Sequence, residues 1–113
     1  MYAISAESIV KTNIAKNKKK IRRLVESGED NFFETVKKVN GFSQCIILMN
    51  ALRILDTARS DQALAEDIIY DLFLHTCKYG NGTYKLTERQ MDVVESFLRP
   101  FLRLNKMNRE LAA

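Results

Sequence analysis

The chain has 113 residues, of which 46% are hydrophobic and 28% are charged, and its formal net charge is +4. This composition is typical of a folded globular protein and argues against disorder, and the length fits one domain spanning residues 1–113. Four glycines and one proline are too few to supply the turns of a β-rich fold. We therefore expect an all-α domain, a single compact bundle of four to six helices.

Positive charge is concentrated near the amino end of the chain. Between positions 11 and 23 there are seven basic residues and no acidic one: Lys11, Lys16, Lys18, Lys19, Lys20, Arg22 and Arg23. The spacing of Val10, Ile14 and Ile21 predicts a helix with one buried apolar seam, and we expect it to begin at Ser5 and to end near Gly28. Like charges four residues apart weaken a helix by about 0.2–0.5 kcal/mol per pair, a cost that a bound anion would remove.

A short helix is predicted next. Asn31 and Glu34 have the spacing of a capping box, and Phe32 and Val36 fall on one apolar face that ends near Gly41.

The segment of about 43–59 predicts a buried helix at the centre of the bundle. Apolar residues cover most of its circumference, and only Asn50, Arg53 and Thr57 form a polar side. Ser43 is the expected N-cap of this helix. Ser60 and Asp61 are expected to end it and to cap the next helix, at about 61–79.

The last helix begins with a capping box made by Thr87 and Gln90. Pro100 lies inside this helix and lacks a backbone N–H, so we expect a kink there or a division into two helices. A second, thinner basic stripe consists of Arg99, Arg103 and Lys106.

Catalytic and metal chemistry is poorly represented in the sequence. The one histidine, His75, is two residues from Cys77, and residues at this spacing do not face each other on a helix. Asp67 and Asp71 lie one turn apart and could hold a divalent cation, although such ions take more oxygen ligands. A solvated acidic face, or an internal counter-surface for the cation-rich helix, explains them better. Cys45 is expected to be a reduced core thiol, like Cys77. We predict no catalytic residue, metal site, cofactor or small-molecule substrate.

The cation-rich helix favours association with a nucleic-acid backbone, or with an assembly that handles nucleic acid. The predicted contacts are Lys11, Lys16, Lys18, Lys19, Lys20, Arg22, Arg23, Arg99, Arg103 and Lys106. A helix-turn-helix over residues 32–55 is rejected as a base reader, because it would expose the most apolar segment to DNA. The alternative is a solvated helix face, partly neutralised by acidic residues of this or another chain: Asp61, Glu66, Asp67 and Asp71.

The composition of the N-terminal part also bears on membrane association and on location. The apolar face of the first helix lacks Trp and Phe, so no membrane association is predicted. The start of the chain has no apolar core of a signal peptide, which indicates a cytoplasmic protein.

A second function is a helical adaptor or inhibitor that docks on another protein. Phe97, Phe101, Leu104 and Leu111, with Asn108 between them, have the spacing of a helical seam that could pair with a second copy. The same residues could instead close the protein's own core. An enzyme is the third and weakest hypothesis.

Overall fold

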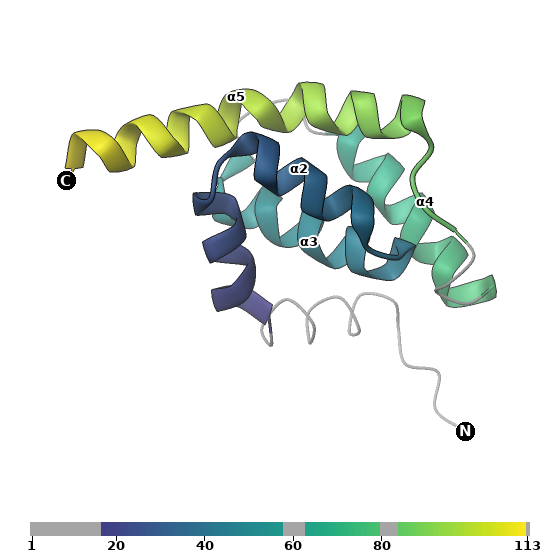
Figure 1. Cartoon of the computed structure of the whole chain (residues 1–113). Helices are drawn as coiled ribbons and strands as arrows, with labels where there is room; N and C mark the ends of the chain where they lie inside the picture. Colours follow the sequence, from purple (N-terminus) through teal and green to yellow (C-terminus); the bar gives the residue numbers. More distant parts are fainter. Residues whose placement is uncertain (1–16, 58–62, 80–83, 113) are drawn as a thin grey trace.

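The computed structural model describes residues 17–57, 63–79 and 84–112, and in these residues every regular element is a helix. Residues 17–26 are helical, and four further helices follow in chain order: α2 (Glu29–Lys38), α3 (Gly41–Ile54), α4 (Ala63–Tyr79) and α5 (Glu88–Ala112). The all-helical prediction is confirmed. Figure 1 shows α5 lying across the other helices and projecting beyond them at its C-terminal end.

The helix at 17–26 buries one side only. Ile21 and Val25, one turn apart, are 4% and 2% exposed, and Leu24 is partly buried beside them. The helix ends just before Gly28, whose φ of 104° is a conformation that only glycine adopts without strain. The predicted start at Ser5, and the seam residues Val10 and Ile14, lie outside the described residues.

Helix α2 begins three residues earlier than predicted. Its N-cap is Gly28, and the amide of Phe32 donates to the Gly28 carbonyl at 3.0 Å. Asn31 is already inside the helix and uses its side-chain amide on the Ser27 hydroxyl at 2.7 Å, so it does not cap. The prediction failed because two acidic residues, at 29 and 30, form the first turn in place of a polar cap.

Helix α3 is capped by Asn40 and not by Ser43. The Asn40 Oδ1 atom accepts the backbone N–H of Ser43 at 2.9 Å. The helix ends at Ile54, several residues before the predicted boundary at Ser60 and Asp61, which lies outside the described residues. The positive φ of Asp56, 51°, marks the turn that ends it.

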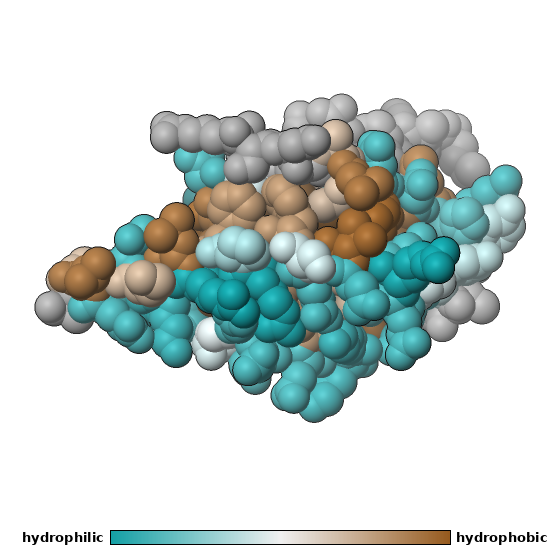
Figure 2. Space-filling view, turned by 90° about the horizontal axis from the view of Figure 1, so that it is seen from above, coloured by the Kyte–Doolittle hydropathy of each residue, from teal (hydrophilic) through white to brown (hydrophobic). Residues whose placement is uncertain are grey.

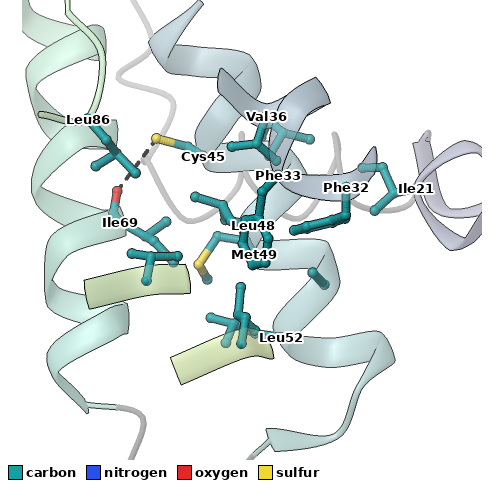
Figure 3. Close-up of a cluster of buried hydrophobic side chains, with 14 of the residues drawn as sticks. Ile21, Phe32, Phe33, Val36, Cys45, Leu48, Met49, Leu52, Ile69 and Leu86 are labelled. Atoms are coloured by element: carbon teal, nitrogen blue, oxygen red, sulfur yellow. Dashed lines mark hydrogen bonds between the residues drawn. The ribbon is translucent and has the colours of Figure 1, made fainter. Parts of the chain in front are cut away.

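The core is built around α3, nine of whose fourteen residues are buried. Figure 3 shows Leu48, Met49 and Leu52 of this helix among Phe32 and Phe33 of α2 and the side chains of neighbouring helices. Because these apolar side chains surround the helix, the predicted burial of this segment is confirmed.

Among the described residues four polar ones are also buried, namely Gln44, Asn50, Thr57 and Thr76. The sequence pattern groups Asn50 and Thr57 on the polar side of the helix, and the structure shows that both are nevertheless buried. Asn50 donates its side-chain amide to the Ile46 carbonyl at 2.9 Å, within its own helix. A polar side chain that forms a hydrogen bond within its own helix can be buried at little cost in free energy. Its polarity therefore does not reveal whether it faces the core or the solvent.

Gln44 joins three segments. Its Nε2 donates to the Val36 carbonyl at the end of α2 at 3.0 Å, and its Oε1 accepts the N–H of Leu86, also at 3.0 Å. Gly41 lies where α3 meets the same connector, and a Cβ there would collide with the carbonyl oxygen of Tyr84. The segment leading into α5 is therefore held tightly against α3.

Helix α5 begins with the predicted capping box. The backbone N–H of Gln90 donates to the Thr87 hydroxyl at 3.2 Å, and the Thr87 N–H donates to the Gln90 side chain at 3.0 Å. The helix then continues through Pro100 as one element of 25 residues, so a division into two helices does not occur. A kink at Pro100 stays a prediction.

Candidate nucleic-acid interface

The exposed part of the cation-rich helix carries Lys18, Lys19, Lys20, Arg22 and Arg23, which we call the cationic segment. All five side chains are exposed, on the sides of the helix not occupied by Ile21 and Val25. Lys11 and Lys16 lie outside the described residues. The local reason for this arrangement is amphipathicity, because the two apolar residues fix which side of the helix meets the core.

No carboxylate neutralises the cationic segment in the part of the chain that the structure describes. The ion pairs between the described residues lie elsewhere, mainly where α2 meets α5, and none includes these five residues. The acidic residues expected to cover the segment are Glu66, Asp67 and Asp71 of α4, which take no part in the ion pairs just described, and Asp61, which lies outside the described residues. Five positive charges on six consecutive residues therefore face solvent.

The second basic stripe is arranged differently, because Arg99 is satisfied inside the protein. Its Nη1 donates to Glu29 Oε1 at 3.0 Å and to Asp30 Oδ1 at 3.2 Å, while Nη2 donates to Glu95 Oε2 at 3.2 Å. The guanidinium carbon also lies 4.9 Å from the centroid of the Phe33 ring. Sequence reasoning treated Arg99 as an open cation, and the structure uses it to join α5 to the start of α2.

Arg103 reinforces this junction. Its Nε donates to both carboxylate oxygens of Glu29, at 2.8 and 3.1 Å. This hydrogen bond, with that from Arg99, lowers the pKa of Glu29 from its ordinary value of 4.5. Lys37 adds a contact of 2.7 Å from its Nζ to Glu95 Oε1. Of the three predicted contacts on α5, only Lys106 is left as an exposed cation with no ion pair among the described residues.

An exposed aromatic cluster was missed by sequence reasoning. The His75 ring lies 4.5 Å from that of Tyr84 and 5.5 Å from that of Tyr79, centroid to centroid. Tyr84 lies in the connector before α5, and nothing in the local sequence pattern places it against α4. The cluster occupies the end of α4 near the connector, away from the cationic segment (Figure 1).

The residues considered for catalysis are not assembled into a site. His75 and Cys77 are both exposed, and His75 packs against aromatic rings. Within the described residues there is no group of three or more His, Cys, Asp and Glu side chains placed to hold a metal ion. Cys45 is fully buried, and burial raises the pKa of its thiol to about 12. It is therefore a core residue, as predicted, whereas Cys77 lies on the surface.

The described residues form two sizeable surface hollows. One, of about 660 Å³, lies between the start of α2 and α5 and has charges of both signs, including Asp30 and Lys106. The other, of about 480 Å³, is mainly apolar and lies between helix 17–26, α2 and α3. Neither lining contains a histidine or a cysteine.

Comparison with known proteins gives no family. No family model, no curated protein and no solved structure matches this chain. Helices long and apolar enough to cross a bilayer are absent from the described segments. The functional argument therefore depends on the geometry of this chain alone.

Proposed function

We propose that this protein is a small non-catalytic helical protein that associates with nucleic acid, or with an assembly that handles nucleic acid, through its basic N-terminal helix. The observation that supports the proposal is the cationic segment, whose five side chains are exposed and unpaired among the described residues. Phosphate backbones are the ligands that such a surface attracts most strongly, because each neutralised phosphate releases condensed counterions.

The expected contact is with the backbone and has little sequence specificity. Cys45, Ile46 and Leu48 of α3 are buried in the core, so this helix does not offer a base-reading face. Arg99 and Arg103 are bound to carboxylates, so we restrict the proposed contacts on α5 to Lys106. Lys11 and Lys16 belong to the proposal on the sequence pattern only.

The test is binding of labelled duplex and single-stranded DNA and RNA, measured by fluorescence anisotropy over a range of salt. A variant with Lys18, Lys19 and Lys20 changed to Gln removes three exposed cations. Each lost phosphate contact reduces the slope of log K against log salt by about 0.9 on duplex DNA, so we expect a slope reduced by about 2.7 if all three lysines contact phosphate.

A matched control separates a local interface from net charge. Lys38, Arg53 and Arg89 are also exposed, and changing them to Gln removes the same charge from other surfaces. The control should keep most of the wild-type affinity. The proposal is wrong if wild type does not bind at low salt, or if both variants weaken binding equally.

A second candidate function is docking on another protein as an adaptor or inhibitor. It is favoured by large apolar side chains that remain exposed on α4 and α5, for example Leu64 at 63% and Leu111 at 82%. An isolated partner should lose its affinity when one of these side chains becomes Asp, and retain it when the cationic segment is neutralised. The opposite pattern would exclude this candidate.

A further inference from the structure

The C-terminal part of α5 has an apolar face that stays exposed and on which no other described helix packs. Leu102 is the last buried residue of the helix, which continues for ten more residues to Ala112. On this extension Leu104 is 54% exposed, Met107 57% and Leu111 82%. Figure 2, which looks down onto α5, shows apolar surface running from the projecting tip of the helix toward the body of the molecule.

This apolar face continues into two half-buried rings. The rings of Phe97 and Phe101 are in contact, with their centroids 5.3 Å apart and their planes tilted by 45°. We define the α5 seam as the residues that share this side at heptad spacing, which are Phe97, Phe101, Leu104, Asn108 and Leu111. A 4-3-4-3 spacing of this kind keeps one stripe of a helix facing a partner helix over successive turns.

The residues beside the seam indicate what kind of partner fits it. Asn105 and Met107 flank it and are uncharged, while the charged residues of this part of α5 lie elsewhere on the helix. Two identical seams can therefore approach without bringing like charges together. A partner selected by opposite charge would instead require charged flanking positions.

We infer that the α5 seam pairs with the α5 seam of a second copy of this chain. Asn108 is the polar residue within the seam, and a single asparagine of this kind selects register and number of helices at a cost in affinity. The seam has about two heptads and buries little area, so we expect weak, reversible pairing rather than a permanent dimer.

Pairing would also position the cationic segments. Arg109 Nη2 lies 3.6 Å from Glu26 Oε2, and Nη1 donates to the Glu26 carbonyl at 3.4 Å. The end of helix 17–26 is thus attached to the extension that forms the seam, so a dimer would hold both cationic segments close to its junction. This consequence rests on the proposed function, whereas the pairing itself does not.

The pairing is tested by sedimentation equilibrium of the full chain over a wide concentration range, at high salt and without nucleic acid. Leu104→Asp places a charge in the seam, and Leu74→Asp is the matched control, because Leu74 on α4 is 55% exposed. We expect wild type and Leu74→Asp to share one dimerisation constant, and Leu104→Asp to associate at least about tenfold more weakly. Both positions are exposed, so the variants should keep the wild-type circular dichroism.

Asn108→Leu tests the register of the seam. Removing its one polar residue should tighten association about tenfold or more, or produce larger oligomers. The inference is overturned if wild type stays monomeric at every concentration, even if another protein binds the seam, or if the Leu74 control dissociates as far as Leu104→Asp. It is also overturned if Asn108→Leu changes nothing. Neutralising the cationic segment should leave dimerisation intact, so failure of nucleic-acid binding and failure of pairing are separate results.

Discussion

At the scale of single residues, Gln44 contributes more to the stability of the fold than its position in an apolar helix suggests. It is 1% exposed, and its amide group satisfies one carbonyl of α2 and one N–H of the connector before α5. A buried backbone group that loses its partner costs about 1–3 kcal/mol. The free energy of unfolding should therefore respond strongly to this one side chain.

We expect Gln44→Leu to lower the free energy of unfolding by about 2–4 kcal/mol, because the Val36 carbonyl and the Leu86 N–H both lose their partner. Urea titration followed by circular dichroism measures the change. Ser43→Ala is the control, since Asn40 binds only the backbone of residue 43, and it should change stability by less than about 0.5 kcal/mol. Equal stability of Gln44→Leu and wild type would show that the bridge has no energetic role.

The two cysteines should differ in reactivity. Cys77 is exposed, while Cys45 is buried, has a pKa raised to about 12, and donates its S–H to the Ile69 carbonyl at 3.5 Å (Figure 3). Thiolate is the reactive form, so a thiol reagent at neutral pH should modify Cys77 alone in the folded protein and both residues after unfolding. Rapid modification of Cys45 under native conditions would contradict the packing of α3 against α4.

At the scale of elements, the contact of α2 with α5 depends on Glu29 and its two arginine partners. Because its pKa is lowered by folding, Glu29 stabilises the folded state fully above its ordinary value of 4.5. This contribution is lost as the pH falls from 4.5 through the lower value of the folded state.

Glu29→Gln should lower the melting temperature at neutral pH, and the difference from wild type should shrink as the pH falls below 4.5. Thermal melts of both proteins over this range measure it. Glu34→Gln on the same helix is the control, because Glu34 is exposed and has no ion pair among the described residues, so its effect should be small at every pH. A constant difference between Glu29→Gln and wild type would assign the effect to packing instead of charge.

Elements differ in how far the sequence could predict them. The Thr87–Gln90 capping box was predictable, because both partners lie within one turn. The same rule failed at Asn31, where Gly28 and two acids start the helix without a side-chain cap. The caps of α3 illustrate a further limit: Asn40 and Ser43 are both good N-cap residues, and local pattern alone does not choose between them.

At the scale of the whole molecule, burial of α3 was predictable from its composition, and the exposure of the cationic segment followed from seven cations around a narrow seam. The ion pair of Arg99 was not predictable from the sequence, because its partner Glu29 is 70 positions away. The contact of Tyr84 with His75 was missed for the same reason, since it depends on where the connector packs. Long-range pairs decide which charged residues of this protein are available to a ligand.

Those long-range pairs also bear on the order of folding. Arg99 and Arg109 reach back across 70 and 83 positions to Glu29 and to the Glu26 carbonyl. Bringing the ends of a free segment of that length together costs about 4 kcal/mol of chain entropy before any contact forms. The contacts of Arg99 with Glu29 and of Arg109 with Glu26 should therefore form at a low entropic cost only after α3 and α4 have folded and brought these segments closer together. We expect them to form late in folding.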